Sequence, residues 1–77
     1  MNPKMHTLED LKVGEKARVS SILTTGSMRR RLQDLGVIEG TRVECLHRSP
    51  SGDPVAYLIR GAAIALRSED SSGILVS

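Results

Sequence analysis

Aromatic residues are almost absent from this 77-residue sequence, which has no Phe, no Trp and a single Tyr, Tyr57. Modules that bind single-stranded nucleic acid or Pro-rich peptides need clustered aromatic side chains, on which bases or prolines stack. Most pockets that bind sugars or nucleotides by stacking also need aromatic side chains. The composition therefore argues against these binding modes.

Cysteine and long apolar runs are equally scarce. Cys45 is the only cysteine, so no internal disulfide can form, which favours a reducing compartment. No apolar run approaches the roughly 20 residues that a membrane-spanning helix needs, and residues 1–6 lack the apolar segment of a secretory signal. We therefore expect a cytoplasmic protein that is not embedded in a membrane.

The motifs of catalysis are missing too. The sequence has no Gly-x-Ser-x-Gly, no His-Glu-x-x-His and no phosphate-binding glycine loop, and its two histidines are His6 and His47. We therefore predict no enzymatic activity, no catalytic residues, no cofactor and no small-molecule substrate. The net charge of +2 is too small to predict nucleic-acid binding without a local basic patch.

The most informative stretch is a corner between a helix and a strand, marked by two glycines. Leu32 and Leu35 are three residues apart and share a helix face. Gly36 then stops the helix by adopting a positive φ, which places Val37 against Leu32, and Gly40 permits a turn into the next strand. We predict that Leu32, Leu35 and Val37 belong to the core, and that the glycines maintain the backbone geometry.

Short β-strands are expected on either side of this corner. We expect a loose tail at residues 1–6, a short capped turn at 7–11 and a polar loop at 68–73. Gly61 is predicted to lie in the tight reversal of a hairpin. The apolar pattern slips at residues 20–22, which predicts a bulge or a strong bend. One amphipathic helix is predicted at 27–35, capped by Ser27. The predicted strands are 16–23, 42–48, 55–59, 63–67 and 74–76. About five short strands and one inserted helix predict a small, mainly β barrel.

A cluster of arginines is the strongest charged feature of the helix. Arg29, Arg30 and Arg31 are consecutive and follow Met28, which lies on the apolar face of the helix. Three interpretations stay open at this point: a solvated helix face, a surface that binds an acidic protein, and a nucleic-acid contact. A steep salt dependence of duplex DNA binding would support the third.

Cys45 and His47 are the candidates for a metal site. They are two residues apart on a predicted strand, which places the thiol and the imidazole on the same side. A tetrahedral site needs about four ligands, and here the sequence offers two. We therefore predict a partly buried cysteine and a histidine at the rim, with no metal bound. The alternative is a homo-oligomer that binds a transition metal with ligands from two molecules.

Several segments together resemble the FeoA family, the small cytosolic component of bacterial ferrous iron transport. They are Leu-Glu-Asp-Leu-Lys-Val-Gly-Glu at 8–15, Arg-Leu-Gln-Asp-Leu-Gly-Val-Ile-Glu-Gly at 31–40, Pro-Ser-Gly-Asp-Pro at 50–54, Arg-Gly-Ala-Ala-Ile-Ala-Leu-Arg at 60–67, and Ile74 with Val76. The resemblance covers most of the chain in the family's order. It implies that residues 1–77 form one SH3-like β-barrel domain with a helical insertion.

The same resemblance implies a role beside FeoB, a membrane transporter with a cytosolic GTP-binding domain. We expect the docking surface on the inserted helix, residues 28–35, with the adjoining loop, and Met28, Arg29, Arg30 and Arg31 as partner-binding residues. Weak self-association stays open. The alternative is a regulatory barrel associated with nucleic acid or with an iron-dependent repressor, since such repressors carry the same barrel as an accessory domain.

Overall fold

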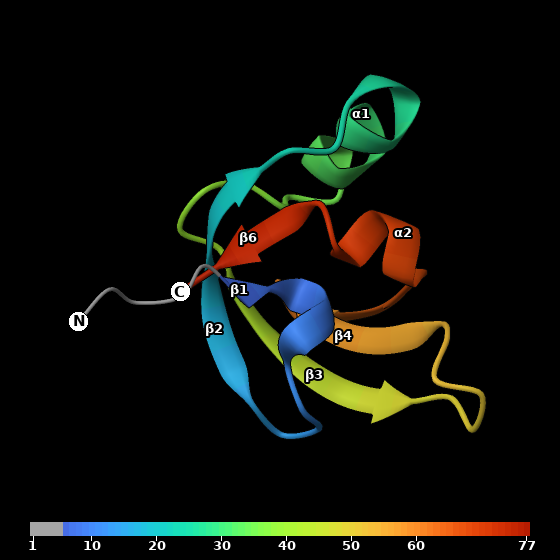
Figure 1. Cartoon of the computed structure of the whole chain (residues 1–77). Coiled ribbons are helices and arrows are strands. Elements are labelled where there is room, and N and C mark those ends of the chain that lie inside the picture. Colours follow the sequence, from blue (N-terminus) through green and yellow to red (C-terminus); the bar gives the residue numbers. More distant parts are fainter. Residues whose placement is uncertain (1–5) are drawn as a thin grey trace.

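The computed structural model describes residues 6–77 and arranges six strands in one antiparallel sheet of order β1-β6-β2-β3-β4-β5 (Figure 1). The strands are β1 His6–Thr7, β2 Lys16–Ile22, β3 Arg42–Arg48, β4 Val55–Ile59, β5 Ala62–Leu66 and β6 Ile74–Val76. The helices are the 3₁₀ turn η1 Leu8–Asp10, α1 Gly26–Asp34 and the short α2 Ser68–Ser71. The sheet curves around a shared core, and α1 lies at one end of the molecule (Figure 1). The prediction of a mainly β fold with one inserted helix between strands is confirmed.

The bend predicted at residues 20–22 is present in β2. The first half of β2 pairs with β3, and the second half pairs with β6, with a register shift between Val19 and Ser21. A bulge bends the strand that carries it and increases the local twist. One strand therefore serves both halves of the curved sheet.

β4 is an interior strand, as its apolar sequence predicted, because it pairs with β3 on one side and β5 on the other. The predicted reversal at Gly61 is also present. Arg60 has a φ of 51° and Gly61 a φ of 83°, and two central residues with positive φ are typical of the type I′ hairpin turn. β5 begins at Ala62, one residue earlier than predicted, because this turn needs only two residues.

The core is apolar and includes the single aromatic residue. Tyr57 is fully buried, and its hydroxyl donates a hydrogen bond to the backbone oxygen of Leu8, 3.2 Å away. This bond ties η1 to β4. The turn predicted at residues 7–11 is confirmed, since Asp10 Oδ2 accepts from the Thr7 N–H at 3.0 Å, and Leu8 and Leu11 are buried. The other buried apolar residues are Val19, Leu32, Val37, Val43, Cys45, Val55, Ile59, Leu66, Ile74 and Val76.

Some sequence-based boundaries were wrong. The predicted tail 1–6 extends outside the described residues, except for His6, which pairs with Val76 in β1 and adds a sixth strand. Residues 68–73 were predicted as a loop but contain α2, because Asp53 Oδ1 accepts from the Ser68 N–H at 2.8 Å and orients the first turn. The strand predicted at 16–23 ends at Ile22.

None of the helices within residues 6–77 has the length and apolar character to cross a membrane.

Candidate partner-binding surface

α1 begins one residue before the predicted start. Thr25 occupies the N-cap position without a side-chain hydrogen bond to the helix, and Ser27, the predicted cap, is an exposed residue inside α1. Gly26 has a φ of 71°, a left-handed conformation that turns the loop into the helix and that glycine adopts without a steric cost. Backbone geometry therefore positions the start of α1.

The end of α1 has the predicted glycine stop. The Val37 N–H donates to the Leu32 oxygen at 2.8 Å, and the Gly36 N–H donates to the Gln33 oxygen at 2.9 Å. Together with the φ of 88° at Gly36, these bonds form a Schellman motif. Leu32 and Val37 are fully buried, which confirms their place in the core.

Leu35 was predicted in the core and is instead 37% exposed. It is the C-cap residue of α1. Val37, which returns toward the barrel through the Schellman turn, takes the core position at the end of the helix. Leu35 therefore remains at the rim of the barrel.

The loop after α1 exposes a second apolar side chain. Thr41 Oγ1 accepts from the Ile38 N–H and donates to the Gly36 oxygen, both at 3.1 Å, and Gly40 makes the intervening turn with a φ of 90°. These bonds leave the Ile38 side chain 53% exposed. Ile38 was not named among the predicted partner-binding residues, although it lies in the loop that adjoins the helix, between two turn glycines.

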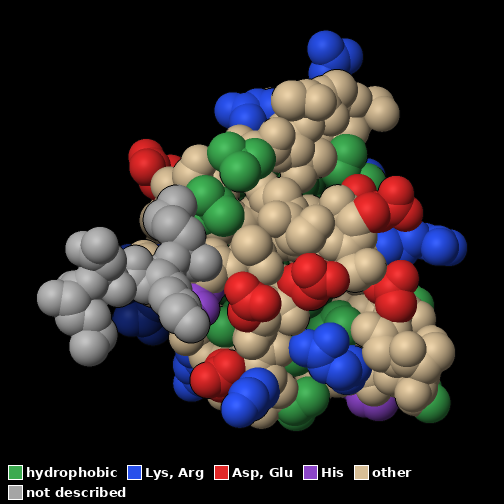
Figure 2. Space-filling view, in the orientation of Figure 1, with side chains coloured by type: hydrophobic (Ala, Val, Ile, Leu, Met, Phe, Trp, Pro, Cys, Tyr) green, Lys and Arg blue, Asp and Glu red, His purple; other side chains and the backbone are tan. Residues whose placement is uncertain are grey.

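The three consecutive arginines have different environments. Arg29 Nη1 donates a 2.9 Å hydrogen bond to the backbone oxygen of Ile22, and so holds α1 against the end of β2. Arg30 and Arg31 are exposed on the outer side of α1, while Met28 is half-buried and packs on the core. Basic side chains project from the α1 end of the molecule in Figure 2. All three arginines are exposed, and Arg29 differs from the other two by its hydrogen bond to β2.

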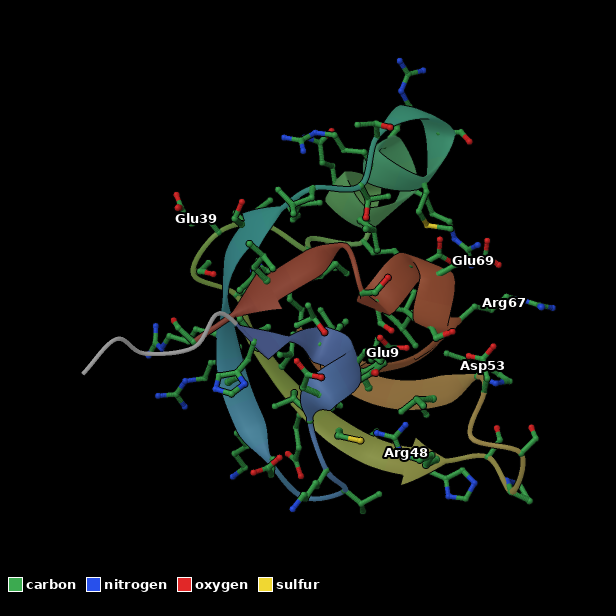
Figure 3. All side chains as sticks on the ribbon, viewed as in Figure 1. Glu9, Glu39, Arg48, Asp53, Arg67 and Glu69 are labelled. Carbon is green, nitrogen blue, oxygen red and sulfur yellow. The ribbon has the colours of Figure 1, made fainter. Side chains whose placement is uncertain are left out.

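A groove of about 310 Å³ lies between α1, the bulged end of β2 and the loop after α1. Figure 3 shows Glu39 on that loop, close to the end of β2. The groove combines polar walls with the exposed Ile38. Its lining residues are Ser20, Ser21, Ile22, Arg29, Gln33, Val37, Ile38 and Glu39.

Cys45 and His47 do not lie on the same side of β3, contrary to the sequence-based expectation. The register with β4 shifts between them, so Leu46 is an extra residue and the alternation of faces is reversed beyond it. Cys45 is fully buried, whereas His47 is exposed. Burial raises the pKa of the Cys45 thiol, which keeps it protonated at neutral pH and makes it a poor metal ligand. Within residues 6–77, no group of three or more His, Cys, Asp or Glu side chains could hold a metal ion.

The short curved antiparallel sheet with one helix inserted between β2 and β3 is the architecture of a small SH3-like barrel. The sequence matches the family model of the FeoA domain over residues 6–77, and the chain therefore belongs to the FeoA family.

Two solved structures are similar to this chain. The FeoA protein from Chlorobium tepidum is 35% identical with a TM-score of 0.87, over 92% of this chain and 68% of that one. The Stenotrophomonas maltophilia FeoA complexed with zinc, an SH3 domain protein, is 26% identical with a TM-score of 0.84, over 94% of this chain and 89% of that one. A manganese-dependent transcriptional repressor has a TM-score of 0.86 at 22% identity, over 99% of this chain and 42% of that one, a likeness that shows the fold alone.

A relative from Porphyromonas gingivalis is a fusion of Fe(2+) transport protein A with the Fe(2+) transporter FeoB. It is 30% identical to this chain over 69 residues, which are 90% of this chain. The chain spans 8% of the length of that relative. In the fusion protein, a FeoA part and a transporter part are thus covalently joined.

Proposed function

We propose that this protein is an accessory component of bacterial ferrous iron uptake, which docks on the cytosolic GTP-binding region of a FeoB-type transporter and alters its assembly or activity. The observation that carries the proposal is the Porphyromonas gingivalis relative, in which both parts belong to one polypeptide. Covalent fusion holds two domains at a high effective concentration, which favours a contact between them. The role needs no cofactor and no chemical step by this chain.

The docking surface that we propose is the outer side of α1 with the groove beside it. Arg30 and Arg31 are exposed, and the exposed Ile38 lies in the wall of the groove. An apolar centre beside arginines is typical of protein interfaces, where arginine is enriched. Arg29 holds α1 in place through Ile22 and also lines the groove.

The proposal predicts that the full chain binds the purified cytosolic region of the transporter. The double variant Arg30→Glu/Arg31→Glu should weaken this binding by about tenfold or more, because like charges would then face an acidic partner. The matched control is Arg67→Glu, which reverses an exposed arginine next to α2. Isothermal titration calorimetry measures the dissociation constants, and thermal melts verify that each variant is folded.

Two outcomes would contradict the proposal in different ways. No binding by the native chain, with or without GTP analogue, would remove the transporter from the proposed role. If the native chain binds, and neither Arg30→Glu/Arg31→Glu nor Ile38→Ser changes the dissociation constant, the contact lies elsewhere on the barrel. Because Ile38 is already exposed, Ile38→Ser should not disturb the fold.

A further inference from the structure

Three arginines form a row across the outer face of the sheet. Arg18 on β2 is level with Arg42 on β3 in the strand register. Val43 is level with Ile59 on β4, so the next step of the same register places Arg60 beside Arg42. All three arginines are exposed. We refer to Arg18, Arg42 and Arg60 as the arginine row.

The arginine row is unfavourable for folding. Like charges directly opposite each other on neighbouring strands destabilise a sheet. Arg60 also has a φ of 51°, a left-handed conformation that is sparsely populated by residues other than glycine, asparagine and aspartate. The neighbouring row contains one carboxylate, Glu44, which is level with Lys16. A cluster that breaks two local rules is a candidate functional site.

The charges on another face of the molecule are arranged differently. Figure 3 shows Glu9, Asp53 and Glu69 interspersed with Arg48 and Arg67 around η1 and α2. Charges of both signs therefore alternate there, as is common on a solvated surface. The arginine row has no such alternation among its own members.

Two hollows adjoin the arginine row. One, of about 280 Å³, is lined by Lys16, Arg42, Val43, Glu44, Leu58, Arg60 and Gly61. The Val43 side chain faces the core, so the partly exposed Leu58 supplies the apolar contact of this hollow. The charged residues around it are three cations, Lys16, Arg42 and Arg60, and one carboxylate, Glu44. The other, of about 370 Å³, is bounded by Arg42 and Arg60 with the backbone of the Gly40 turn. Arg42 and Arg60 border both hollows.

We propose that the arginine row binds an extended protein segment that carries carboxylates next to an aliphatic side chain. Carboxylates match the planar donor groups of arginine, and an aliphatic side chain matches the partly exposed Leu58. A phosphate or a nucleic-acid backbone would leave Leu58 uncovered. A bilayer would require protruding apolar groups, whereas Leu58 is only partly exposed. This site lies on β2, β3 and the turn after β4, and does not depend on the role proposed for α1.

Selection of short peptides of random sequence against the immobilised full chain tests this proposal. We expect enrichment of peptides that combine Asp or Glu with Leu, Ile or Val. A synthetic peptide of the enriched sequence should bind more weakly as salt increases. Arg42→Gln should weaken binding by more than about tenfold, as expected for the loss of a charge-assisted hydrogen bond. Leu58→Ser should also weaken binding, whereas Arg67→Gln and Arg30→Glu/Arg31→Glu should not.

Several results would overturn the proposal. They are the absence of any enriched peptide, enrichment of peptides without carboxylates, and binding that is insensitive to both Arg42→Gln and Leu58→Ser in variants that melt like the native chain. Inorganic phosphate, duplex DNA or phosphatidylserine vesicles could each displace the peptide. If one of them does so, and the Arg42→Gln variant no longer binds it, the surface is assigned to that ligand instead. Retained peptide binding in Arg30→Glu/Arg31→Glu separates this test from that of the α1 surface.

Discussion

The side chain of Arg60 lies directly across Gly36, so that a β-carbon at position 36 would overlap Arg60 Cδ and lie 2.8 Å from Nε. Gly36 is the residue that ends α1, and Arg60 is the last member of the arginine row. The helix-to-strand corner and the basic face of the sheet therefore meet at this contact.

Gly36→Ala should lower the free energy of unfolding by about 1–2 kcal/mol, because alanine at a φ of 88° is strained. Arg60 is exposed and flexible, so displacing its side chain should cost less than the backbone strain. The loss should therefore persist when Gly36→Ala is made in an Arg60→Ala background, as measured by urea unfolding. If the loss disappears in that background, the clash with Arg60 rather than the backbone is the main cost.

Arg29→Ala should destabilise the protein by about 0.5–1.5 kcal/mol, because the hydrogen bond to the Ile22 oxygen is lost. Arg30→Ala is the matched control, since it removes the same charge from the same helix at an exposed position. Chemical denaturation of both variants measures the difference. Equal stability of the two variants would show that water replaces the Arg29 guanidinium without cost.

Stability should fall at alkaline pH. Burial raises the pKa of the Cys45 thiol and of the Tyr57 hydroxyl above their ordinary values of 9.0 and 10.0. In the unfolded chain both groups lose their protons at lower pH than in the folded chain. Their contribution to the free energy of unfolding is therefore complete below pH 9 and declines as the pH rises through the folded pKa values. Urea unfolding at a series of pH values should show this decline, and Cys45→Ala should make it less steep. A decline of the same slope in Cys45→Ala would exclude the thiol as a contributor.

Arg18→Gln should raise the free energy of unfolding by about 0.2–1 kcal/mol, because it removes the like charge opposite Arg42. The gain should shrink at high salt, where exposed charges are screened. Thermal melts at low and high salt measure both effects. A loss of stability at low salt would mean that Arg18 makes a favourable contact that outweighs the repulsion.

Local sequence chemistry predicted much of the fold. The strands 42–48, 55–59 and 74–76 were predicted with the boundaries that the structure has, because each follows a residue that favours turns, Gly40, Pro54 or Gly73. The stop at Gly36 and the burial of Leu32 and Val37 follow from one short motif whose hydrogen bonds are all local. The prediction of Ser27 as a cap was wrong because Gly26 offered an alternative start through its backbone.

What the sequence determined by itself is therefore the set of features that depend on local residue patterns: the glycine stop at Gly36, the tight reversal at Gly61 and the limits of most of the strands. Only the tertiary structure decided which side chains of these elements share a surface. The bulge at Leu46 separated His47 from Cys45, and the bond to Ile22 gave Arg29 a contact with β2 that no pattern in the helix indicated. The arginine row joins residues far apart in the chain. It follows from strand register, which depends on how the whole sheet packs and not on any local pattern.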